Sequence, residues 1–123
     1  MPDRRATELD ASIGGFTGDS FRVLLDGETL LHEHLGYGYQ PQARRTLQPS
    51  ADEWEEFWAA VDEVGVWTWE RRYADDSVMD GTHWSIVLAE GSRQTESAGT
   101  NAAPAGFADL CAAISKLVDA PFQ

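Results

Sequence analysis

Positive charge is scarce in this sequence. Nine lysine and arginine residues stand against 21 aspartate and glutamate residues, which gives a formal net charge of -12, and Lys116 is the single lysine. A field of this sign repels phosphate backbones and anionic lipid headgroups. We therefore expect neither nucleic acid nor a membrane surface among the partners of this protein.

Cysteine and long apolar runs are also scarce. Cys111 is the only cysteine, so no internal disulfide can form, and we expect it to be an inert, packed thiol. No segment approaches the ~20 apolar residues of a membrane-spanning helix, and residues 1–19 lack the apolar run of a secretory signal. These absences predict a soluble cytoplasmic protein.

Motifs for cofactor chemistry are missing as well. The chain has no phosphate-binding loop, no dinucleotide fingerprint and no set of four zinc ligands, and no serine or cysteine lies in a nucleophile motif. We therefore expect no cofactor and assign no catalytic residue. An enzyme is the less favoured class.

The acidity itself has three interpretations. A salt-adapted proteome, such as that of halophilic archaea, produces acidic and lysine-poor proteins in general, and GC-rich coding favours arginine over lysine. The third interpretation is a binding device, as in inhibitors that mimic nucleic acid or immunity proteins that neutralise a basic toxin. The sequence leaves all three open.

The N-terminal half predicts an arm, a hairpin and a helix. Residues 1–19 show no sustained period and are expected to form a flexible arm. Residues 21–25 and 29–35 alternate around an Asp-Gly turn and predict two paired strands, after which residues 36–41 suit a bulge or twisted edge. A capping box at Ser50 and Glu53 opens a helix with an apolar stripe, which Gly65 ends, and its other face is acidic.

The most aromatic stretch is Val66–Leu88. Residues 66–73 and 82–88 alternate with period two, which predicts an antiparallel hairpin at the centre of a sheet, with Tyr73 opposite Thr82. Alternate residues of the two strands then share one face: Trp67, Trp69, Arg71 and Tyr73 with Trp84, Ile86 and Leu88. Arg71 can stack there on Trp84 or Tyr73. Because two helices must bury their stripes, we expect this face to be core, and we expect Trp54, Trp58, Trp69 and Trp84 to be largely buried.

The C-terminal part predicts a third strand and a second helix. Residues 93–98 are polar on both faces and predict an edge strand, residues 99–103 a loop, and Pro104 the first turn of a helix that carries an apolar stripe from Phe107 to Val118. The predicted order is ββαβββα. We expect residues 20–123 to form a single two-layer α+β domain, a mainly antiparallel sheet of about five strands with two helices on one face.

One candidate site is a metal centre. His32 and His34 are two residues apart on a strand, so both imidazoles point to the same side, and Asp75, Asp76 or Asp80 can supply a carboxylate. An ordinary exposed strand explains the two histidines at least as well, and a hairpin loop closed by Asp80-Gly81 explains the aspartates. A metal-binding protein or metal-dependent enzyme is therefore the alternative function.

A second candidate site is a small anion site before the second helix. A helix N-terminus carries unpaired amides and partial positive charge, so Gly99, Thr100 and Asn101 can accept an anion, aided by His83 and Arg72. The structural alternative is that Asn101 caps the helix and Gly99 supplies a positive φ.

Four aromatic and glycine motifs follow one another along the chain: Trp54-x-x-Phe57, Trp67-x-Trp69-x-x-x-Tyr73, Asp80-Gly81-Thr82-x-Trp84 and Gly99-x-Asn101-x-x-Pro104-x-x-Phe107. Between Phe21 and Val118 this pattern resembles that of small uncharacterised prokaryotic α+β domains. The resemblance implies a fold, and it implies no activity and no site residue.

The favoured function is a non-enzymatic binding or protein-interaction domain, of the inhibitor or immunity kind. The acidic helix face is the expected contact for a basic protein partner. We expect the chain to be a monomer or a weak homodimer that pairs through an edge strand.

Overall fold

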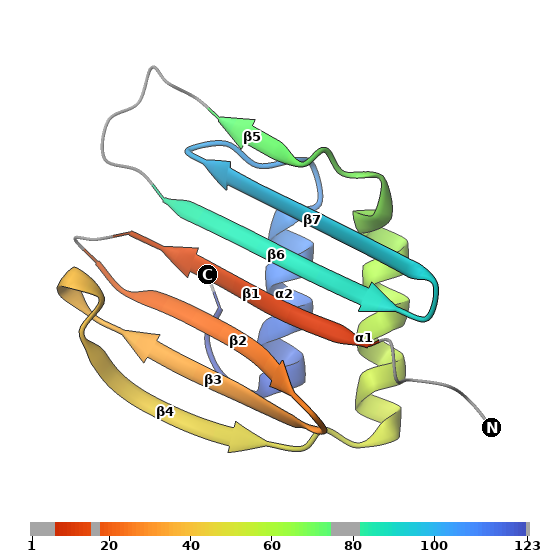
Figure 1. The fold of residues 1–123 in the computed structure, drawn as a ribbon, viewed down its shortest axis with the longest axis horizontal. Coiled ribbons are helices and arrows are strands. Elements are labelled where there is room, and N and C mark those ends of the chain that lie inside the picture. Colours follow the sequence, from red (N-terminus) through yellow and green to blue (C-terminus); the bar gives the residue numbers. More distant parts are fainter. Residues whose placement is uncertain (1–6, 16–17, 75–81, 123) are drawn as a thin grey trace.

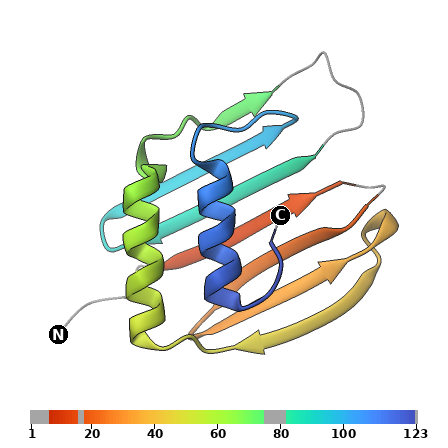
Figure 2. The same ribbon diagram turned by 180° about the vertical axis from the view of Figure 1, so that it is seen from behind.

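The computed structural model describes residues 7–15, 18–74 and 82–122. Within these residues the chain forms one sheet, and two helices pack across one of its faces (Figures 1 and 2). The strands are β1 (Glu8–Gly14), β2 (Ser20–Asp26), β3 (Thr29–Leu35), β4 (Pro41–Leu47), β5 (Arg72–Ala74), β6 (His83–Glu90) and β7 (Arg93–Thr100). The helices are α1 (Ala51–Val64) and α2 (Phe107–Val118), with short 3-10 turns η1 (Tyr37–Tyr39) and η2 (Val66–Thr68).

The sheet has the strand order β4-β3-β2-β1-β6-β7-β5. All neighbouring pairs are antiparallel except β5 and β7, which are parallel. The α+β class is therefore confirmed, whereas the described part of the sheet has seven strands and the prediction of about five is wrong. None of the described helices is long and apolar enough to cross a membrane.

Two of the strands were missed. Glu8–Gly14 forms β1, which lies between β2 and β6, so the prediction of a flexible arm over 1–19 is wrong for this segment. Its alternating apolar pattern, Leu9, Ala11 and Ile13, contains only three residues and lies beside several glycines, so it did not indicate a strand. Pro41–Leu47 forms β4, which lacks an apolar period because nearly all of it is exposed at the sheet edge.

The expected hairpin between residues 66–73 and 82–88 is wrong. Residues 66–68 form η2, directly after Gly65 at φ 82°, and Trp69 N donates to Val66 O, so an extended strand cannot begin there. The tight β6–β7 turn places β7 along β6, and β5 then pairs in parallel with the far edge of β7. Consequently β7 is not the edge strand that its polarity predicted.

The aromatic face of the sheet is nevertheless core, as expected. Tyr73 is aligned with Gly99, which is aligned with Trp84, so Tyr73 and Trp84 share the face that the helices cover. Trp58 and Trp84 are each 4% exposed, and Trp54 and Trp69 are partly buried against the same core. Arg71 does not stack there, because its side chain is 83% exposed and binds Glu96.

Both helices occur where their apolar stripes predict them. In α1, Ser50 and Glu53 form the expected capping box, and Gly65 is the left-handed C-cap. In α2, the stripe is buried, but the helix begins at Phe107 after Gly106, so Pro104 is not in its first turn. Asn101 does not cap this helix, because the N-cap position belongs to Gly106, which has φ 89°.

Candidate functional site

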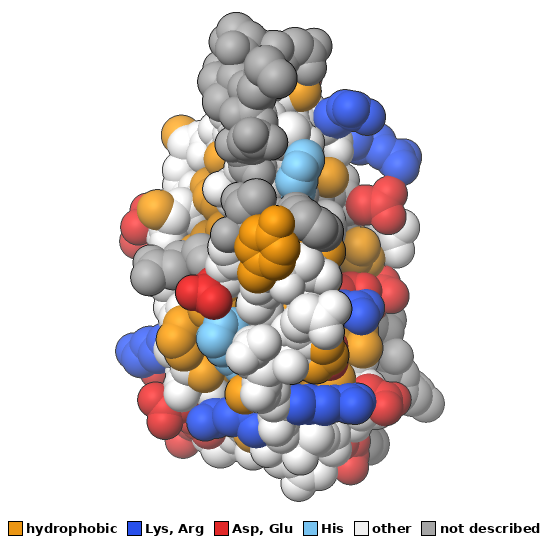
Figure 3. Space-filling model, turned by 90° about the vertical axis from the view of Figure 1, so that its left-hand side faces the viewer, with side chains coloured by type: hydrophobic (Ala, Val, Ile, Leu, Met, Phe, Trp, Pro, Cys, Tyr) orange, Lys and Arg blue, Asp and Glu red, His pale blue; other side chains and the backbone are white. Residues whose placement is uncertain are grey.

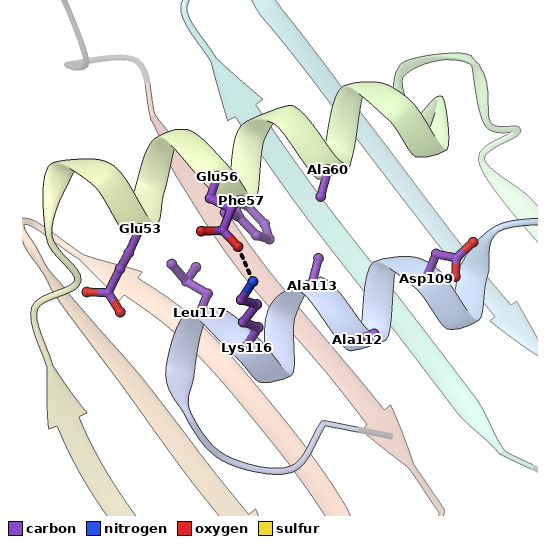
Figure 4. Close-up of a pocket in the computed structure, with 9 residues that line it drawn as sticks. All are labelled: Glu53, Glu56, Phe57, Ala60, Asp109, Ala112, Ala113, Lys116 and Leu117. Carbon is purple, nitrogen blue, oxygen red and sulfur yellow. Dashed lines mark hydrogen bonds and ion pairs between the residues drawn. The ribbon is translucent and has the colours of Figure 1, made fainter.

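The candidate site is a groove on the outer surface of the helical layer, between α1 and α2 (Figure 4). Its apolar floor comes from Phe57 and Ala60 of α1 and from Ala112, Ala113 and Leu117 of α2. Phe57 and Leu117 are almost fully buried and belong to the core below. Since three alanines stand where larger side chains would close the seam, a space of about 280 Å³ is left.

The rim of the groove is acidic. Glu53 and Glu56 border it from α1 and Asp109 from α2, while Lys116 is the one cation among the lining residues. Figure 4 shows Lys116 of α2 reaching across to Glu56 of α1, with which it forms an ion pair. Both partners of this bridge are largely exposed, so it stabilises the helix pair only weakly and can open at little cost.

Further carboxylates extend the acidic surface along α1. Asp52, Glu55 and Glu63 are exposed, and their carboxylates form no ion pair with another residue that the structure describes. The predicted acidic face of α1 is therefore present. Because α2 packs beside it, the acidic face and the apolar seam form one continuous surface.

Asp62 belongs to the same helix but is held in a structural network. Its Oδ1 atom accepts hydrogen bonds from Trp67 Nε1 at 2.8 Å and from Arg93 Nη1 at 2.6 Å. The bond from Trp67, and then that from Arg93, lowers the pKa of Asp62. Arg93 also binds Glu90 and lies 4.6 Å from the centroid of the Trp67 ring. This network fastens the end of α1 to the β6–β7 turn.

The two histidines of the predicted metal site share a face of β3, but each already has a partner. His32 is buried, and its Nε2 atom lies 2.7 Å from the carbonyl oxygen of Pro121. His34 is partly exposed, stacks on Phe21 with ring centroids 4.9 Å apart, and has Nε2 2.9 Å from Asp19 Oδ1. The structure therefore brings His34 together with Asp19 instead of with His32.

The rest of the predicted metal site is not tested. Asp75, Asp76 and Asp80 lie outside the described residues. No group of three or more His, Cys, Asp or Glu side chains suited to a metal ion occurs in the part of the chain that is described. The metal site stays a prediction, and no observed geometry favours it.

The residues of the predicted anion site lie on one corner of the sheet. His83 and Thr100 are cross-strand partners, with Nδ1 and Oγ1 3.1 Å apart, and Arg72 is one step away on the same face. Figure 3 faces this end of the sheet and shows histidine side chains at two separate places, not in one cluster. Asn101 has φ 59°, and its backbone N–H donates a hydrogen bond to Thr82 O. Since α2 begins at Phe107, its N-terminal amides belong to residues after Gly106 and not to residues 99–101.

The groove was not predicted from the sequence, although the acidic face of α1 was. Ala60, Ala112 and Ala113 carry no chemical signature, and only the packing of α1 against α2 makes them a floor. The available signal was the pair of adjacent alanines in an otherwise regular apolar stripe. Cys111, by contrast, is buried as expected, and burial raises the pKa of its thiol to about 11.

Comparisons with known proteins add no relative. No protein-family model matches the chain, and no curated protein matches its sequence. Function therefore has to be inferred from the surface of the molecule and its chemistry.

Proposed function

We propose that this protein is a non-enzymatic binding domain that docks a basic protein partner in the groove between α1 and α2. The observation that supports this function is the combination of an apolar floor with an acidic rim, on the outer side of an acidic helix. Such a domain suits the neutralisation of a basic enzyme or toxin, as an inhibitor or immunity protein does.

The size of the groove favours side chains of a protein over a small ligand. Pockets for drug-sized ligands usually measure about 300 to 1,000 Å³ and enclose most of the ligand. The groove, at about 280 Å³, falls just below that range and is open along the helices. It therefore accommodates one or two side chains that project from a larger partner.

The chemistry of the groove favours arginine, lysine and leucine side chains. The methylene stems of arginine and lysine can lie on Phe57 and the alanines while their cationic ends reach Glu53, Glu56 or Asp109. An arginine can also bind a carboxylate through two parallel hydrogen bonds. The net charge of -12 attracts a basic partner from a distance and accelerates association at low salt.

The experiment that tests this function uses a synthetic helical peptide with leucine on one side and arginine on the other. We expect binding of this peptide in calorimetry, and weaker binding as salt is added, because screening reduces the attraction. Ala112→Trp fills the groove from an exposed position of α2 and should weaken binding at least ~10-fold, or about 1.4 kcal/mol.

Ala59→Trp is the matched control, since Ala59 is also exposed on a helix but does not line the groove. This variant should bind like the wild type. A peptide of the same pattern with glutamate in place of arginine should not bind. Equal affinity of both tryptophan variants, or equal binding of both peptides, would refute the proposed function.

A further inference from the structure

The face of the sheet opposite the helices is covered by no other described element of the chain (Figures 1 and 2). A sheet face of this kind is usually either solvated and polar or packed against a second layer. The strand registers align its side chains in two neighbouring rows that run across the sheet. These rows differ in charge.

The first row is apolar and acidic. Leu31, Leu24, Asp10, Val87 and Glu96 are consecutive cross-strand partners from β3 to β7. The two leucines and Val87 are partly exposed, so aliphatic surface is open to solvent at the centre of the face. The row contains two carboxylates and no cation, and each carboxylate pairs with an arginine of the same copy, Asp10 with Arg22 and Glu96 with Arg71.

The second row lies two residues further along each strand and is basic. Arg44, Glu33 and Arg22 are consecutive partners on β4, β3 and β2, and Arg72 on β5 continues the row at the other edge. Three arginines against one glutamate give this row a net charge opposite to that of the first row. Ser85, near the middle, is exposed and small.

We propose that this open face binds a second copy of the chain, with the acidic row of each copy against the basic row of the other. A two-fold axis produces this arrangement if it lies in the plane of the interface and runs parallel to the two rows, midway between them. It places β1 over β1 of the partner and keeps the strands of the two sheets aligned, as in ordinary sheet-on-sheet packing. The aliphatic residues of the first row then cover the serines and arginine stems of the second.

Electrostatics favour this face over the other surfaces. The chain as a whole has a net charge of -12, so two copies repel each other wherever acidic surfaces meet. On the open face the two central rows carry three arginines and three carboxylates and so add no net repulsion, while Glu8 and Asp26 lie in the next row toward the edge of that face. The helical layers, with their acidic grooves, remain on the outside of the dimer.

The area of the face sets the strength of the contact. The six longer strands, spaced ~4.8 Å apart and ~23 Å long, give a face of roughly 650 Å² per copy, to which the three residues of β5 add little. This is somewhat less than the ~800 Å² per partner of a standard interface. The dimer is therefore concentration-dependent and not permanent.

The test is sedimentation equilibrium of the full chain from about 1 μM to 1 mM, a range that covers affinities typical of weak complexes. The average mass should rise from 13.6 kDa toward twice that value. Ser85→Glu places a carboxylate in the basic row, opposite the acidic row of the partner, and should weaken self-association at least ~10-fold. Ser85→Lys adds a cation at the same position and should leave association equal or stronger.

Ser92→Glu is the control, because it makes the same substitution in the exposed β6–β7 turn, away from the face. It should associate like the wild type, and circular dichroism should show all four proteins folded. A wild type that stays monomeric throughout would overturn the proposal. Association of Ser85→Glu at wild-type strength would also overturn it, and would indicate another contact such as the free edge of β4. Weakening by Ser85→Lys or Ser92→Glu equal to that by Ser85→Glu would overturn it as well. The groove function does not depend on this outcome.

Discussion

Gly99 is constrained by its neighbours and not by its backbone angle. It does not have the positive φ that its sequence context predicted; instead, a Cβ atom there would overlap the indole nitrogen of Trp84 and the carbonyl of Ala102. Trp84 Nε1 donates to this carbonyl at 2.8 Å, so the indole cannot move away without losing a bond. Only glycine leaves room at this position for the indole of Trp84.

Gly99→Ala should therefore lower the free energy of unfolding by about 1 to 3 kcal/mol, the usual cost of overpacking a core. Urea denaturation monitored by tryptophan fluorescence measures the change. Gly18→Ala is the control, since a Cβ there meets nothing within 4 Å and its φ is not positive. Equal stability of the two variants would show that the indole has room to shift.

Cys111 gives the molecule a defined response to alkaline pH. Burial raises the pKa of its thiol from 9.0 to about 11 in the folded state, so the folded state disfavours the thiolate. The stability that depends on the neutral thiol is fully present below about pH 9, and is lost as the pH rises toward 11. Wild type should therefore lose stability relative to Cys111→Ala over this window, as measured by urea denaturation at each pH. A constant difference between the two proteins from pH 8 to 11 would contradict the burial of the thiol.

At the scale of elements, the segment after α2 is fixed by groups from the sheet. Arg45 Nη2 donates to Val118 O at 2.6 Å, His32 Nε2 lies 2.7 Å from Pro121 O, and Phe122 is 1% exposed. The chain therefore returns from the helix onto β3 and β4. His32, a candidate metal ligand from sequence, here has a structural contact.

Phe122→Ala should cost about 3 to 5 kcal/mol, as expected for a buried aromatic side chain, although it lies next to the last residue. Phe122→Leu should retain most of the stability because it fills much of the same space. Thermal or urea unfolding of the two variants provides the measurement. If Phe122→Ala unfolds like the wild type, the C-terminal segment is not part of the core.

The elements that sequence predicts well are those with local signals. Ser50 and Glu53 start α1, Gly65 ends it, and Asp26-Gly27 turns β2 into β3, each through contacts within a few residues. The pairing of β5 with β7 is not local, because β6 lies between them in the sequence and pairs with the other edge of β7. Alternation in residues 66–73 indicated a strand, but it contains no information about which edge receives that strand.

At the scale of the whole molecule, the two faces have different charge. The helical layer carries the acidic rim and the apolar groove, whereas the two central rows of the open sheet face balance three arginines against three carboxylates. The acidic face of α1 was predictable from the sequence, because all of its residues belong to a single helix. The groove was not predictable, because it arises only where Ala60 of α1 meets Ala112 and Ala113 of α2.

The helical groove is proposed as the binding surface of the whole molecule. The most direct measurement is a nuclear magnetic resonance titration of the isotope-labelled protein with the leucine-arginine peptide, following every backbone amide. We expect the largest shifts to cluster on α1 and α2 around Ala60, Ala112 and Ala113, and we expect Ala112→Trp to remove them. Shifts that cluster on the open sheet face, or none at peptide concentrations of about 1 mM, where even weak binding is detectable, would contradict the proposal.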